Sequence, residues 1–144
     1  MPEGKRTSLV KPTLKTPFHI DFDWWQKNER DWHVYLRSLL CAEHQQVFAN
    51  LEEGQTIDWV DPLTAEVKPV DGVQNTLMSH CAKQPDFLTE QTALVEAVFR
   101  LFLTNGNLPL SSEEMGARLN RPAMTILRTL TAGRVYKGIR PVDV

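Results

Sequence analysis

The last third of the chain places its apolar residues at helical spacing in two short runs. In the first run, Met115 and Leu119 lie one turn apart, and Ser111 and Glu114 have the spacing of a capping box. The second run keeps a single apolar stripe, formed by Ala123, Ile126 and Leu130. Asn120, between the runs, tolerates the left-handed backbone of a tight turn. The pattern predicts a helix, a tight turn and a second helix over about 122–132.

A strongly apolar helix is predicted just before this pair. Thr89 is placed to cap a helix over residues 90–104, and Asn105-Gly106 is typical of a helix end. Because residues 90–104 are apolar on nearly every side, this helix must be covered on most of its surface. We therefore expect the two halves of the chain to form one fused body.

The middle of the chain, residues 18–86, mixes helix and strand patterns. Residues 18–23 alternate as a short strand does, and Asp23 is placed to cap a helix that carries apolar residues as far as Leu40. Residues 45–54 predict a short helix and a turn. Residues 56–60 and 65–70 predict a β-hairpin, and Asp71 is placed to cap a helix to about Lys83. The predicted fold class is mainly α, of the α+β type.

Composition narrows the class of protein. The chain of 144 residues is 42% hydrophobic and 24% charged, as expected for a globular domain. It has no apolar run near the roughly 20 residues of a membrane helix, and its start lacks a signal-peptide core. Two cysteines make no disulfide framework. We expect a cytoplasmic protein without membrane contact.

Charge is distributed unevenly along the chain. Residues 1–17 carry four basic side chains and one acidic one, and residues 99–144 carry seven basic and three acidic ones. Residues 18–98, in contrast, carry five basic and 14 acidic side chains. We expect a basic flexible arm over 1–17, an acidic helical part with the hairpin over 18–86, and a basic domain over 87–144. The basic ends suit a phosphate backbone, and the acidic middle does not.

The stretch LSSEEMGARLNRPAMTILRTL, residues 110–130, resembles the helix-turn-helix of DNA-binding proteins. Its leucines, the Ser-x-Glu-Glu start and Thr125, Ile126 and Arg128 fall in register with that pattern. The departures are Gly116 in place of a small alanine, Asn120 in place of the turn glycine and a proline in place of the usual Ser/Thr cap. The resemblance covers about residues 88–140 at the level of the superfamily. The basic tail, with a Lys137-Gly138 turn, resembles a shortened form of the winged variant.

The resemblance implies sequence-specific binding of double-stranded DNA, as in a transcription regulator, with the second helix in the major groove. Arg121, Thr125 and Arg128 would face the bases, with Met124 at the edge. Ser111 or Ser112 would hold a phosphate at the start of the first helix, and Arg134, Lys137 and Arg140 would lie beside the reading helix. The acidic half would supply a homodimer contact or a contact with transcription machinery.

The same residues are also compatible with a different class of protein. In a non-catalytic interaction subunit, the helix-turn-helix would be a scaffold and the working surface would hold four tryptophans: Trp24, Trp25, Trp32 and Trp59. We find no set of residues that indicates an enzyme, and we assign no cofactor.

The sequence also allows a metal site. Cys41 and His44 have ligand spacing, and His80-Cys81 would complete a zinc site. Neighbouring residues on a helix point about 100° apart, however, and ordinary buried cysteines explain the pattern equally well. We therefore assign no metal from the sequence.

Overall fold

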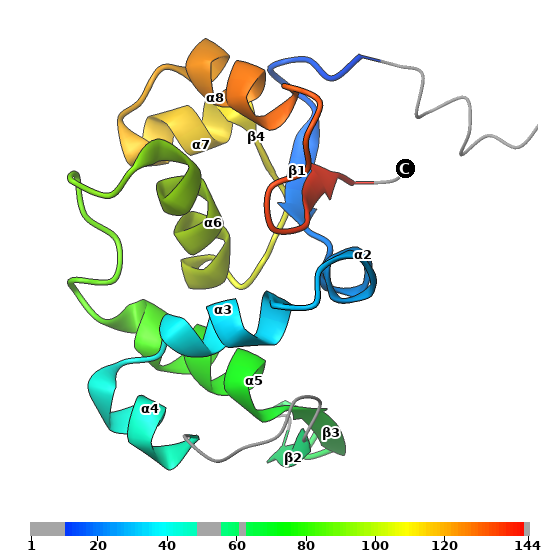
Figure 1. Cartoon of the computed structure of the whole chain (residues 1–144), viewed down its shortest axis with the longest axis vertical. Coiled ribbons are helices and arrows are strands. Elements are labelled where there is room, and N and C mark those ends of the chain that lie inside the picture. The colour runs from blue at the N-terminus through cyan, green and yellow to red at the C-terminus, as the bar shows by residue number, and fades with distance from the viewer. Residues whose placement is uncertain (1–10, 49–55, 61–62, 143–144) are drawn as a thin grey trace, which may run out of the picture.

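The structure, a computed structural model, describes residues 11–48, 56–60 and 63–142. It is mainly helical with a small antiparallel sheet, as the sequence predicts (Figure 1). In chain order, the elements are β1 (Pro17–Ile20), α2 (Phe22–Asn28), α3 (Trp32–Ser38), α4 (Ala42–Val47), β2 (Thr56–Val60), β3 (Val67–Asp71), α5 (Gly72–Ser79), the 3₁₀ helix η1 (Cys81–Lys83), α6 (Leu94–Thr104), β4 (Leu110–Ser111), α7 (Ser112–Leu119), α8 (Ala123–Leu130) and β5 (Ile139–Pro141). Among the described residues, none of the helices is both long and apolar enough to cross a bilayer.

The three-stranded sheet joins the beginning of the chain to its end. Its strand order is β4-β1-β5, with both pairings antiparallel, so the predicted N-terminal strand is the central one. Phe18 lies opposite Leu110, and Ile20 lies opposite Ile139. Phe18 and Ile20 are each 1% exposed. The part of the predicted arm that is described, residues 11–17, therefore leads directly into the sheet, and residues 1–10 lie outside the described part.

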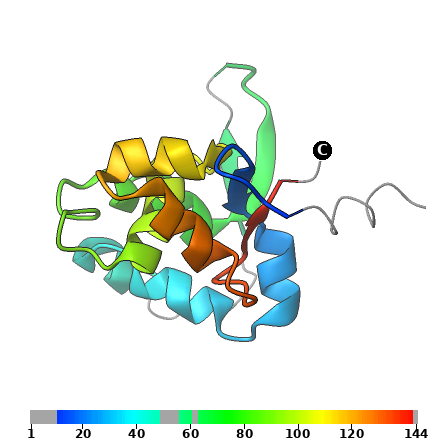
Figure 2. The same ribbon diagram turned by 90° about the horizontal axis from the view of Figure 1, so that it is seen from above.

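The predicted hairpin is present as the two-stranded sheet of β2 and β3. Thr56 pairs with Asp71 at one end and Val60 pairs with Val67 at the other. Figure 2 shows the hairpin extending from the helical body. Asp71 also caps α5, as predicted, because its Oδ1 accepts a hydrogen bond from the backbone N–H of Gln74 at 2.8 Å. The hairpin is thus anchored to the body through the helix that follows it.

The single helix predicted after Asp23 is two helices in the structure, and the first of them begins earlier than predicted. Asp21, not Asp23, is the N-cap, and it accepts from the backbone N–H of Trp24. The helix ends at Asn28, and a second helix, α3, starts at Trp32. Glu29 has an extended backbone at this break, and its carboxylate accepts a hydrogen bond from Trp25 Nε1 at 3.0 Å. The break lets α2 and α3 take different directions.

The apolar helix also starts later in the structure than the sequence predicts. Thr89 and Thr92 form a turn of their own, and α6 begins at Leu94 with Ala93 as its N-cap. Its end at Asn105 agrees with the sequence, and Gly106 follows with a φ of +69°. As its composition predicts, α6 is covered on most sides, with buried residues Ala97, Val98, Phe99, Leu101, Phe102 and Leu103.

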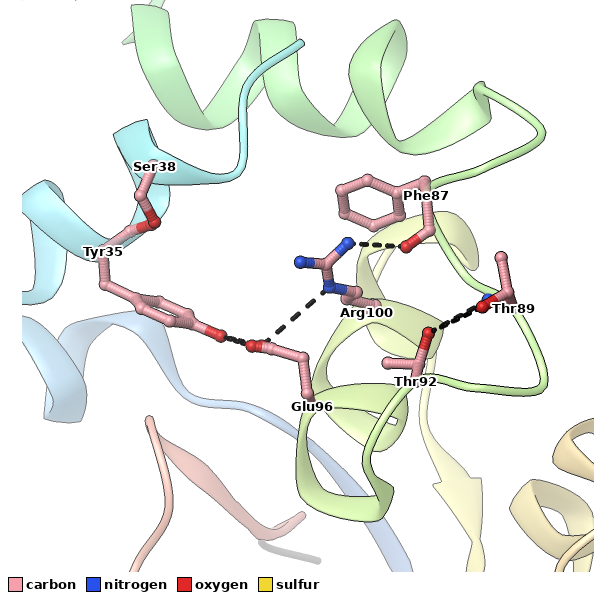
Figure 3. Close-up of polar contacts among 7 residues, drawn as sticks. All are labelled: Tyr35, Ser38, Phe87, Thr89, Thr92, Glu96 and Arg100. Atoms are coloured by element: carbon pink, nitrogen blue, oxygen red, sulfur yellow. Dashed lines mark hydrogen bonds and ion pairs between the residues drawn. The ribbon is translucent and has the colours of Figure 1, made fainter.

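One hydrophobic core links the two halves of the chain. The fully buried ring of Trp25 makes edge contacts with Trp32 in α3 and Phe99 in α6, at centroid distances of 5.9 and 5.4 Å. Figure 3 shows a polar link beside this core, where the Tyr35 hydroxyl of α3 donates to the Glu96 carboxylate of α6. The expected fused body is confirmed, because the core includes residues from both sides of position 86.

Candidate nucleic-acid interface

The two helices predicted for residues 110–130 and the turn between them are present. Ser111 and Glu114 make the predicted capping box, because each accepts a hydrogen bond from the other's backbone N–H. The backbone N–H of Ser111, and then its hydroxyl, hold the pKa of Glu114 below its usual range. Asn120 has the expected left-handed backbone, with φ +56° and ψ +46°. Pro122 is the N-cap of α8, so the helix begins one residue later than predicted.

The polar and apolar sides of α8 lie as the sequence predicts. Ile126 is fully buried and Leu130 is 8% exposed. On the other side, Thr125 and Arg128 are exposed and Met124 is 45% exposed. Within the described part of the chain, this side of α8 is therefore exposed to solvent.

Arg121 has a different environment from its predicted partners on α8. Its Nη2 donates to the backbone carbonyl oxygens of Thr92 at 2.7 Å and Glu90 at 3.1 Å. Both acceptors belong to the turn that precedes α6. The guanidinium therefore holds this turn against the start of α8, and we assign Arg121 a positioning role.

The predicted phosphate site at Ser111 and Ser112 is wrong. Ser111 is 6% exposed and Ser112 is fully buried, since β4 joins the sheet here. The backbone N–H of Glu113 donates to the Leu14 carbonyl, so the N-terminal segment covers the start of α7. A phosphate cannot reach either hydroxyl without displacing this segment.

The basic C-terminal segment divides into two parts. Arg134, which the sequence predicts to lie beside the second helix, is exposed four residues after the end of α8. Lys137 and Arg140 do not lie beside α8 but against the acidic half of the chain. The Lys137 ammonium lies 4.0 Å from the centre of the Tyr35 ring, and Arg140 forms a 3.0 Å ion pair with Asp21. β5 pairs with β1, and the Gly138 carbonyl just before it accepts from the Asp21 backbone N–H at 2.7 Å, so this segment lies against the start of α2.

The N-terminal segment runs past the C-terminal end of α8, a position that sequence reasoning did not predict. Pro12 lines a cavity of about 240 Å³ together with Leu130 and Arg134. Lys11 and Lys15 on this segment are exposed. In Figure 1 this segment is drawn in blue and passes beside α8 before it enters β1. The segment that carries Lys11 and Lys15 therefore contacts the chain at the C-terminal end of α8, far from it in sequence.

The tryptophans contribute mainly to the core. Trp25 and Trp32 are 0% and 4% exposed, and Trp24 is half-buried with the Arg140 guanidinium 5.4 Å from its ring. The Trp59 side chain lies outside the described part. Two of the four residues of the alternative interaction surface are therefore inaccessible to a partner.

A second group of polar residues meets well away from α8. Cys41 and His44, at the start of α4, approach His80 and Cys81, at the end of α5 (Figure 1 labels both helices). Burial raises the pKa of the Cys81 thiol. Two thiols and two imidazoles are donors that suit a transition metal. His33, outside this group, is only 2% exposed, and its Nε2 lies 3.2 Å from the Asp71 carboxylate.

No family model, curated protein or solved structure matches the chain.

Proposed function

We propose that the chain binds double-stranded DNA and regulates transcription, with α6, α7 and α8 acting as a helix-turn-helix. The observation that carries this proposal is the exposure of Met124, Thr125 and Arg128 on one side of α8, while Ile126 on the other side is buried. A helix held by its apolar side and free on its polar side can enter the major groove. The register of residues 110–130 with the helix-turn-helix pattern supports the same conclusion.

Each exposed side chain has a chemical role in this proposal. The Arg128 guanidinium is suited to the two acceptors of guanine, and the Met124 side chain to the methyl group of thymine. Thr125 reaches a base edge or a phosphate. Arg134, Lys11 and Lys15 supply backbone contacts, which fix the position of α8 but do not read sequence.

A dimer follows from the small size of this surface. A helix of eight residues such as α8 is about 12 Å long, so one copy reads few base pairs. Two copies would read two half-sites about one helical turn apart, which doubles the contact. The mass of the complex on a selected site, measured by light scattering, should correspond to two chains per duplex.

The test starts from selection of bound sequences out of a random DNA pool, which identifies the preferred site. Binding to the selected site is then measured by fluorescence anisotropy for Thr125→Ala and Arg128→Ala. Loss of Arg128 should cost about 1–3 kcal/mol and relax the preference at one base pair. The matched control is Arg30→Ala, which removes the same charge from an exposed site between α2 and α3. The proposal fails if no sequence is enriched or if Arg128→Ala and Arg30→Ala behave alike.

A further inference from the structure

Two cysteines and two histidines from two distant segments of the chain lie close together. Cys41 Sγ lies 3.1 Å from His44 Nδ1 and 3.5 Å from Cys81 Sγ. Cys81 Sγ lies 3.7 Å from His44 Nδ1, and a ring nitrogen of His80 is within 4.8 Å of both the Cys41 and the His44 ligand atoms. The cysteines are 40 residues apart in the sequence, so the fold, not the local chain, brings them together.

The three distances among the two sulfurs and His44 Nδ1 are close to the edges of a tetrahedral zinc site. With Zn–S near 2.3 Å and Zn–N near 2.0–2.1 Å, the ligand atoms of tetrahedral zinc lie about 3.3–3.8 Å apart. The two sulfurs and His44 Nδ1 already have nearly this spacing. The His80 ligand atom lies within 4.8 Å of those of Cys41 and His44, and its ring centre is 4.5 Å from that of His44, so His80 must move closer to occupy the fourth corner.

The backbone explains how adjacent residues can serve one site. On a continuous helix, His80 and Cys81 would point about 100° apart. In the structure α5 ends at Ser79, His80 has φ −127° and ψ −62°, and η1 starts at Cys81. The helix therefore breaks between the two ligands. This break removes the objection that the sequence raises against a zinc site.

We propose that Cys41, His44, His80 and Cys81 bind one zinc ion in a structural site. Four protein ligands leave no open position, which is the arrangement of structural rather than catalytic zinc. The thiols bind as thiolates, so each cysteine releases its proton when the ion enters. With two thiolates and two neutral imidazoles, the loaded site has no net charge.

The surroundings of the cluster suit this role. The six-residue helix α4 has no buried side chain, and Cys41, its N-cap residue, makes no side-chain capping bond. An ion bound by Cys41 and His44 would attach α4 to α5, an attachment that apolar packing within α4 does not supply. Cys41 and Cys81 line a cavity of about 290 Å³, which gives the ion a route from solvent.

A disulfide between the cysteines is the competing use of this geometry. The two sulfurs are 3.5 Å apart, and oxidation would bring them to bonding distance. A disulfide, however, makes no use of the two imidazoles, whereas the zinc site uses all four groups. The two uses are therefore separable by the effect of the histidines.

The test uses the full chain, expressed without a polyhistidine tag and purified under reducing conditions without chelator. Elemental analysis should find about one zinc per chain. After removal of the zinc, titration with Co²⁺ should give the strong d–d absorption of a tetrahedral site and a thiolate-to-cobalt charge-transfer band, saturating at one equivalent. These two measurements on the unmodified protein do not depend on any variant folding.

Variants then assign the ligands. Each of four variants should weaken zinc binding by more than about tenfold: Cys41→Ser, Cys81→Ser, His44→Gln and His80→Gln. Losing a residue that only orients a metal ligand already costs about that much, and these variants remove the ligand itself. His19→Gln in β1 is the matched control and should bind zinc like the unmodified chain. The proposal is overturned if the purified chain lacks zinc and Co²⁺ stays octahedral. It is also overturned if zinc binds equally well to the His44 and His80 variants, or if air oxidises Cys41 and Cys81 to a disulfide as readily with zinc present as without it.

Discussion

A β-carbon on Gly116 would lie 2.7 Å from the carbonyl oxygen of Arg121. Such a separation is shorter than real β-carbons tolerate, and the neighbouring atom is backbone rather than a flexible side chain. Gly116 is also the acceptor for the Arg121 backbone N–H, at 3.1 Å. The glycine therefore sets how closely α7 approaches the turn that leads into α8.

Gly116→Ala should destabilise the protein, although alanine favours a helix by about 1 kcal/mol over glycine. Overpacking at a closed site costs about 1–3 kcal/mol, so the steric cost is expected to exceed the gain in helix propensity. Urea unfolding measures the change. Ala117→Gly, at an exposed site in the same helix, reports the propensity effect alone. A more stable Gly116→Ala variant would contradict the close approach.

The capping box should make stability depend on pH at acid values. Because the hydrogen bonds of Ser111 lower the pKa of Glu114, its contribution is present in full above the ordinary glutamate pKa of about 4.3. It is lost as pH falls through the lower pKa of the folded state. Glu114→Gln should therefore flatten the acid side of a plot of unfolding free energy against pH. Glu113→Gln, one residue away and exposed, removes the same charge without touching the capping box and is the matched control.

Tyr35 and Glu96 should be coupled, because their hydrogen bond joins α3 to α6 (Figure 3). Tyr35→Phe should cost about 1–3 kcal/mol by leaving the part-buried carboxylate without this donor. Tyr136→Phe is the matched control, since Tyr136 is 36% exposed. In a double-mutant cycle with Glu96→Ala, additive effects would argue against the bond.

The same hydrogen bond should affect the ionisation of Tyr35 in an alkaline titration. Burial, and then the hydrogen bond to Glu96, raise the pKa of Tyr35. Tyr35 therefore contributes its full stability below the ordinary tyrosine pKa of about 10 and loses it progressively at higher pH. Ultraviolet absorption should show a phenol that ionises above the ordinary tyrosine range, and Tyr35→Phe should remove that step. An alkaline titration curve unchanged by Tyr35→Phe would contradict the burial of Tyr35.

The basic residues after α8 should separate into DNA contacts and structural contacts. Arg134→Ala should weaken DNA binding across all sequences and reduce the salt slope by about 1, as for a phosphate contact. Lys137→Ala should leave DNA affinity nearly unchanged but lower stability, because its ammonium lies over the Tyr35 ring. Anisotropy at several salt concentrations distinguishes the two. Equal losses of affinity would place Lys137 at the DNA surface after all.

The local features were predictable because the interactions that make them span few residues. The capping box of Ser111 with Glu114 and the turn at Asn120 depend on residues three or four positions apart. The exposed side of α8 follows from helical periodicity alone. Boundaries were less predictable, since the break at Glu29 depends on tertiary packing around Trp25 as well as on local preference.

Sequence alone therefore determined the mainly helical class, the hairpin, the helix pair over residues 110–130 and the polar side of α8. Only the tertiary structure decided that Pro17–Ile20 is the central strand and that Lys137 and Arg140 face the acidic half. It also decided that Cys41 and Cys81, 40 residues apart, meet at one point. The physical reason is the range of the interactions: periodicity and capping act within a few residues, whereas pairing of distant strands and convergence of ligands depend on how the whole core packs.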